Sequence, residues 1–293
     1  MRQAAHVRLD RWAGYTRPVA ADRIAQNLAF INWTVLTALA VGGFGAVALG
    51  RIRTGATRGY LAFTAICSAA FALLALLSDI GLPSAASSAV PTDPTWDIPR
   101  RVALAALAVL SVAYAIAVRR GRRAPALAVA GLGAGGLALL AGALAWAGGA
   151  MAVVPLVIQL ALLAAATGGV FASMILGHWY LVTPKLPEAP LILFSRLLLG
   201  IVALQVLLFA AWVATGTGGG GPFSALTGPW ALFVWLRLLV GLVFPIVVAW
   251  AAVQTARTRS MESATGLLYI AVGAIAAGTI LAAGLYFGAG MLV

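Results

Sequence analysis

Long apolar runs separated by short arginine-rich breaks make up most of this chain. A run of about 20 apolar residues can cross the hydrocarbon core of a bilayer as a helix. Lipid cannot satisfy the polar backbone of an open strand, so such runs are predicted to be helical. They lie at about 28–50, 60–82, 102–118, 126–149, 152–183, 190–214, 229–254 and 263–290. The pattern predicts an all-α, polytopic integral membrane protein, a bundle of about eight transmembrane helices.

The composition argues against a soluble protein. Of the 293 residues, 63% are hydrophobic and 9% are charged, too few polar groups to cover a water-exposed surface. A net charge of +12 would suggest nucleic acid in a soluble domain. Here the arginines flank apolar runs, so the predicted partners are membrane lipids and other protein subunits, and no nucleic acid is expected.

The chain divides into a basic tail over 1–27, read as an interfacial segment, and a single transmembrane domain over 28–293. The breaks after the first, third, fifth and seventh runs carry most of the basic loop residues, which are arginines except for Lys185 after the fifth run. The positive-inside rule places these basic loops in the cytoplasm and both termini outside, in the inner membrane of a prokaryote. The arginines of the tail oppose this orientation. No strong internal repeat is evident.

Motifs for soluble catalysis are missing from the sequence. Gly216, Gly218 and Gly221 fit G-x-G-x-x-G but follow a spanning run, which indicates a loop between helices. No phosphate-binding G-K-[ST] loop, zinc motif or nucleophile turn occurs. The one cysteine, Cys67, has no partner for a disulfide or metal cluster. The chain is therefore interpreted as a non-catalytic or quinone-interacting subunit rather than a stand-alone enzyme.

Cofactors follow from the two histidines. His6 and His178 fall on opposite sides of the predicted topology, so haem is not expected from this chain alone, and no covalent cofactor or metal is predicted. His178, Trp179 and Tyr180 combine a proton-exchanging imidazole with aromatic faces, which suits a quinone headgroup or a lipid. The alternative is an interfacial aromatic belt.

Two more charged residues are candidates for the same site. Arg196 and Glu262 fall on the same predicted side as His178 and could complete the quinone or lipid site. Their alternatives are a snorkelling arginine and an acid that complements the dipole of a helix N-terminus.

Arg237 is the charge hardest to reconcile with lipid, because it lies near the predicted bilayer midplane. Asp79 is the predicted partner in an intramembrane pair; the alternative gives Arg237 a place on a substrate or proton path. The amides Asn32, Gln159 and Gln205 are predicted to link helices by hydrogen bonds.

In architecture alone, eight helices without haem ligands resemble the quinone-interacting membrane subunits of respiratory iron–sulfur molybdoenzymes. The leading functional hypothesis is accordingly a membrane subunit of a respiratory or photosynthetic-type electron-transfer complex that contributes a quinone or lipid site. The alternatives are a transporter or channel for an ion, small molecule or lipid, with Pro245 as a bend, and a structural or assembly subunit.

Overall fold

The computed structural model describes residues 20–83, 90–183, 186–217 and 221–293, and within them eight helical spans are long and apolar enough to cross a membrane. The short α1 (Ala20–Gln26) precedes the spans. Seven of the spans are single helices: α2 (Leu28–Arg53), α3 (Arg58–Ile80), α4 (Asp97–Arg119), α5 (Pro125–Trp146), α6 (Ala150–Val182), α7 (Ala189–Thr215) and α10 (Met261–Ala289). The remaining span, between α7 and α10, consists of α8 (Ala231–Leu238), the π-helical turn η5 (Leu239–Val243) and α9 (Phe244–Arg257). The 3₁₀ turns η3 (Pro94–Trp96) and η4 (Ser224–Leu226) precede α4 and α8. The prediction of an all-α membrane bundle is confirmed.

The third span begins earlier than predicted. The sequence pattern started it at 102, because Arg100 and Arg101 look like loop residues, but α4 begins at Asp97. The helix includes both arginines because Asp79 of α3 neutralises them. A charged residue can lie within a buried helix when it has a partner of opposite charge. The pattern of apolar residues along the sequence does not reveal that partner.

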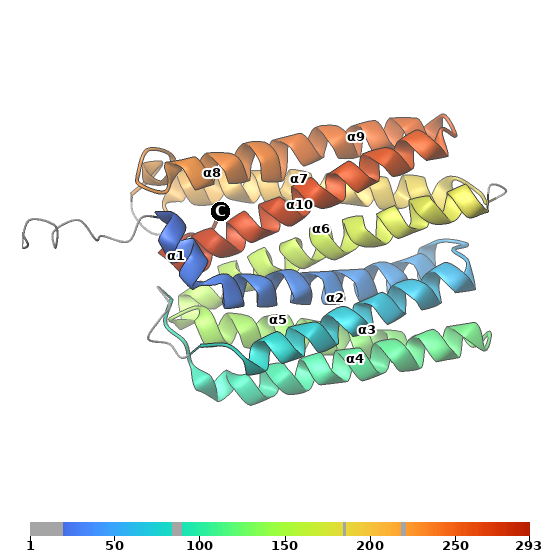
Figure 1. Cartoon of the computed structure of the whole chain (residues 1–293), viewed down its shortest axis with the longest axis horizontal. Helices are drawn as coiled ribbons and strands as arrows, with labels where there is room; N and C mark the ends of the chain where they lie inside the picture. The colour runs from blue at the N-terminus through green and yellow to red at the C-terminus, as the bar shows by residue number, and fades with distance from the viewer. Residues whose placement is uncertain (1–19, 84–89, 184–185, 218–220) are drawn as a thin grey trace, which may run out of the picture.

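The two ends of the bundle differ in charge. The arginine end is the one where α2, α4, α6 and α9 finish, and its described basic residues are Arg51, Arg53, Arg58, Arg119, Arg120, Arg122, Arg123, Arg257 and Arg259. The opposite end, called the carboxylate end, has Asp79, Asp93 and Asp97, and α1 and the C-terminus lie there (Figure 1). His6, Gly218, Lys185 and the tail arginines Arg2, Arg8, Arg11 and Arg17 lie outside the described residues.

The eight spans form two successive halves with the same helix order (Figure 1). In the first half α2, α3, α4 and α5 contact one another in sequence, and α5 returns to α2. In the second half α6, α7, α9 and α10 do the same, and α10 returns to α6. The contacts between halves also repeat, because α2 packs on α6 and α10, while α6 packs on α2 and α5.

Residues at corresponding places keep a constant spacing along the chain. The pairs Trp33 and Gln159, Gly42 and Gly168, and Asp79 and Gln205 are equally far apart in sequence. All six of these residues except Gly42, which is half-buried, are buried. The repeat that the sequence did not reveal is therefore present in the fold. Its visible trace is a Gly-Gly pair, at 42–43 in α2 and at 168–169 in α6.

The halves meet where these glycines cross. A Cβ atom added to Gly42 would lie 1.7 Å from the carbonyl oxygen of Ala164, and one added to Gly168 would lie 2.2 Å from the backbone nitrogen of Gly43. The backbones of α2 and α6 are thus in direct contact, as small residues allow in membrane helices.

Candidate functional site

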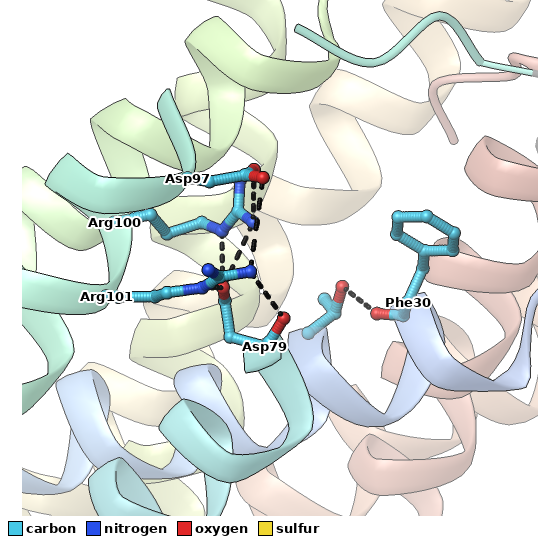
Figure 2. Close-up of polar contacts among 6 residues, drawn as sticks. Phe30, Asp79, Asp97, Arg100 and Arg101 are labelled. Atoms are coloured by element: carbon cyan, nitrogen blue, oxygen red, sulfur yellow. Dashed lines mark hydrogen bonds and ion pairs between the residues drawn. The ribbon is translucent and has the colours of Figure 1, made fainter. Parts of the chain in front are cut away.

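A network of four charged side chains closes the carboxylate end of the first half. Asp79 is fully buried and accepts hydrogen bonds from both Arg100 and Arg101, with 2.8 Å between Arg101 Nε and Asp79 Oδ1. Arg100 Nη2 also donates to Asp97 Oδ1 at 3.0 Å. Figure 2 shows the two arginines of α4 reaching over Asp79 of α3. The network is neutral, with two carboxylates and two guanidinium groups.

Aromatic rings surround the buried half of this network. The guanidinium carbon of Arg100 lies 4.7 Å from the ring centroid of Trp146 and 5.8 Å from that of Trp33. These rings pack edge to face against each other, and Tyr286 of α10 donates a hydrogen bond to the Trp146 carbonyl. Arg100 therefore connects α4 to α2, α3 and α5, which is a structural role.

The predicted pair between Asp79 and Arg237 is wrong. Asp79 belongs to the first half, where Arg100 and Arg101 occupy it, and Arg237 lies in the second half. Sequence depth suggested the pair, because both residues belong to the same part of the membrane, but depth does not specify which helices are neighbours.

Arg237 is bound by neutral groups. It is 3% exposed, its Nη2 donates to Gln205 Oε1 at 3.1 Å, and its Nη1 donates to the Gly241 carbonyl at 3.3 Å. Among the described residues no carboxylate lies within 4 Å of its guanidinium. Arg237 Nε and the nearby Gln159 Oε1 are buried without a hydrogen-bond partner. The site therefore holds an uncompensated positive charge.

Pro245 explains why the Gly241 carbonyl is free to accept from Arg237. In an α-helix this carbonyl would bond to the backbone N–H four residues later, and that residue is Pro245, which has none. The turn η5 widens to a π-helix just before the proline, and Arg237 satisfies the freed carbonyl. Because α8 runs inward from the carboxylate end, this contact directs the guanidinium away from the nearest bundle end.

The Arg237 site corresponds to the Arg100 site, one in each half. In both, the third helix supplies the arginine and the second helix supplies its acceptor, Asp79 in the first half and Gln205 in the second. The first helices supply Trp33 and Gln159 at corresponding positions. The second site therefore has an amide where the first has a carboxylate, and an amide where the first has an aromatic ring.

The π-helical turn changes the spacing of buried residues after Arg237. Leu104 and Leu107 are buried four and seven residues after Arg100, whereas Gly241 and Pro245 are buried four and eight residues after Arg237. Single π-helical turns inside α-helices are frequent at functional sites. The first half has no such turn in its described residues.

Two small, separate voids lie at this site and beside the loop after α7. One of about 10 Å³, room for roughly one water molecule, is lined by Gln159, Gln205 and Arg237. A second of similar size is lined by residues of the loop after α7, including Gly216. Trp212 and Val293 line both voids and so form the partition between them.

The predicted quinone or lipid residues do not converge. His178, Arg196 and Glu262 are exposed, and no hydrogen bond or ion pair joins them in the described structure. Tyr180 is buried, and its hydroxyl donates to the Pro187 carbonyl. These residues share no pocket, so the quinone site stays a prediction.

Trp179 has a packing role. Its indole is half-buried and lies over Gly59, where an added Cβ would be 2.7 Å from the ring. The ring therefore occupies the space that a side chain at position 59 would need, and it holds the end of α6 against the start of α3.

Two of the predicted amide links are present. Gln205 Nε2 donates to the Leu162 carbonyl at 2.9 Å, which orients its oxygen toward Arg237, and Asn32 Nδ2 donates to Ser78 Oγ at 3.1 Å. Sequence reasoning thus found Gln205 as a helix link but missed its position at Arg237. Asp79 and Gln205 are as far apart in sequence as Gly42 and Gly168, and this shared spacing was the signal that could have indicated the position of Gln205.

Outside the spans, Glu188 and Arg259 join two loops of the arginine end, with 2.7 Å between Glu188 Oε2 and Arg259 Nη2. The backbone N–H of Glu188, and then the Arg259 guanidinium, lower the pKa of the Glu188 carboxyl. A lowered folded-state pKa means that this stabilisation is present at neutral pH and is lost as pH falls through that pKa.

We expect the melting temperature of Glu188→Gln to lie slightly below that of the parent protein at pH 7. The difference should shrink as pH falls below about 4.3, the ordinary pKa of a glutamate, and vanish once the pH lies below the lowered folded-state pKa, where the carboxyl is protonated in both the folded and unfolded chains. Thermal unfolding in detergent across this pH range measures it. A difference that persisted in acid would show that the effect comes from something other than the charge.

The comparisons with known proteins find no family model, no curated protein and no solved structure that matches this chain. The functional argument therefore rests on the geometry of the Arg237 site.

Proposed function

We propose that this protein is a membrane transport protein that binds a small anion at Arg237. The observation that carries the proposal is the buried guanidinium of Arg237, whose acceptor is the neutral Gln205, whereas the corresponding arginine of the other half has the carboxylate of Asp79. A charge at this depth is costly unless it is neutralised. An anion that accepts a hydrogen bond from Arg237 Nε would neutralise it and satisfy its free donor.

The size of the site limits the ligand. A void of about 10 Å³ holds roughly one water molecule, so a compact monovalent ion such as chloride, nitrate or formate would fit only with a slight displacement of the lining side chains, and a large organic anion would not fit. Larger ligands would have to separate α7 from α8.

The surroundings of Arg237 provide an access route and a hinge. The ion would enter from the carboxylate end past Trp212, which separates the two voids. The π-helical turn and Pro245 leave the helix less regular beside the binding group, so α8 can tilt relative to α9. Parallel structural repeats with interrupted helices at the binding site are common in secondary transporters.

The arginine end is the cytoplasmic end in this proposal. Arg119 ends α4, and Arg120, Arg122 and Arg123 follow it in the turn before α5, as the positive-inside rule requires. The anion would then enter from outside, and the C-terminus would lie on the outer face.

Exchanging the neutral acceptor for an acid tests the site directly. Gln205→Glu is almost isosteric and gives Arg237 the carboxylate that Arg100 has in the first half. We expect it to reduce nitrate or chloride flux into proteoliposomes at least tenfold, because the new carboxylate competes with the anion. Folding should persist, because the new ion pair with Arg237 offsets the lost hydrogen bond from Gln205 Nε2 to the Leu162 carbonyl.

A second readout separates binding from transport. In the parent protein in detergent, nitrate should raise the melting temperature relative to gluconate, which is too large for the void. Gln205→Glu should abolish that shift. As a control, Asn32→Asp adds the same charge at an exposed amide of α2 and should leave both readouts unchanged. Equal flux in Gln205→Glu and the parent protein would refute the proposal.

A further inference from the structure

An open groove runs along the junction of the two halves in the leaflet nearest the arginine end. It has a volume of about 340 Å³ and is lined by apolar residues of α2, α5, α6 and α7. On α2 its floor is a single stripe that includes Val41, Gly45 and Leu49. The hydroxyl of Ser173, a polar group on its wall, already donates to the Gly169 carbonyl. The groove therefore offers packing surface rather than hydrogen bonds.

The internal repeat explains the groove. Gly45 corresponds to Phe171 in the second half, and Leu197, which also lines the groove, corresponds to Phe71 in the first. Phe171 and Phe71 pack edge to face with centroids 5.3 Å apart, so two rings fill the equivalent place on the other side of the junction. Gly45 and Leu197 are smaller than these two phenylalanines, so the groove stays open.

A positive charge lies at the end of the groove nearest the membrane surface, on the arginine side of the bundle. Residues four apart on a helix share one face, so Arg53 continues the stripe of Gly45 and Leu49. Arg53 is exposed at the last turn of α2, and no ion pair forms with it among the described residues. An apolar channel that ends at an arginine near the membrane surface complements a molecule with an acyl chain and an anionic headgroup.

We propose that this groove is a binding site for one acyl chain of an anionic phospholipid, whose phosphate contacts Arg53. The chain takes the space that Phe171 and Phe71 fill in the other half. The lipid would link the two halves on this side of the Gly42–Gly168 crossing. This inference does not depend on the anion-transport proposal.

The decisive test fills the groove with phenylalanine, the residue at the corresponding position 171 of the second half. A Cβ atom at Gly45 would meet nothing within 4 Å, so Gly45→Phe can fold with its ring in the groove. The protein is reconstituted in nanodiscs with equal phosphatidylglycerol and phosphatidylcholine, released, and examined by native mass spectrometry. We expect the parent protein to retain one phosphatidylglycerol, and Gly45→Phe to reduce that occupancy at least fivefold.

Two further variants make the result specific. Gly133→Phe, on the exposed face of α5 and also without a neighbour within 4 Å of its Cβ, should retain the lipid. Arg53→Gln should still retain a lipid but lose the preference for phosphatidylglycerol over phosphatidylcholine. Full retention in Gly45→Phe, an unchanged preference in Arg53→Gln, or an isoprenoid quinone in place of the phospholipid would each overturn the proposal.

Discussion

Asp79→Ala is expected to destabilise the protein by about 3–5 kcal/mol, because it removes the buried carboxylate of Arg100 and leaves this arginine only the partly exposed Asp97. The loss should appear as a large fall in melting temperature in detergent. It should also disturb the rings of Trp33 and Trp146, which pack on Arg100, and so change the tryptophan fluorescence. The effect is larger than for a surface pair because Asp79 and Arg100 are both buried, so water cannot replace the lost carboxylate.

Two comparisons test the physical reason for this loss. Asp97 contacts the same arginine but its side chain is 37% exposed, so Asp97→Asn should cost less than about 1 kcal/mol. The double variant Asp79→Leu with Arg100→Met removes both buried charges and should recover much of the stability. If Asp79→Ala and Asp97→Asn had equal effects, the buried pair would not be the cause.

Gly168→Ala is expected to cost about 3 kcal/mol or more, although it adds only one methyl group. The new Cβ would lie 2.2 Å from the backbone nitrogen of Gly43, and a backbone cannot rotate away as a side chain can. The crossing of α2 and α6 must then open, which separates the two halves.

The adjacent glycine provides the matched control. A Cβ at Gly169 would meet nothing within 4 Å, so Gly169→Ala should be neutral or stabilising by up to about 1 kcal/mol, as expected for alanine in a helix. Unfolding of both variants in mixed detergent gives the two values. Similar stabilities would mean that the crossing tolerates expansion, contrary to the close contact of the backbones.

The two halves share one arrangement of helices but differ in the side chains at corresponding positions. In the first half the arginine is neutralised and the junction is filled by Phe71. In the second half the arginine has neutral partners, and Leu197 lines an open groove. Both proposals concern these two differences, because the helix arrangement that the halves share does not by itself require them.

The membrane class, the helical structure and the approximate limits of the eight spans could be predicted from the sequence, because they depend on the length and hydropathy of local segments. The sequence also identified Arg237 as a charge in need of an explanation. It could not assign partners: Asp79 was matched to Arg237, and His178, Arg196 and Glu262 were grouped by depth alone.

The choice of neighbouring helices became visible in the fold and not before. The fold paired Asp79 with Arg100, placed Gln205 beside Arg237, and left a groove above Gly45. The physical reason is that apolar helices in lipid have many arrangements of similar hydrophobicity. The choice among them depends on close backbone contacts such as that of Gly42 with Ala164, and on buried polar pairs between residues distant in sequence.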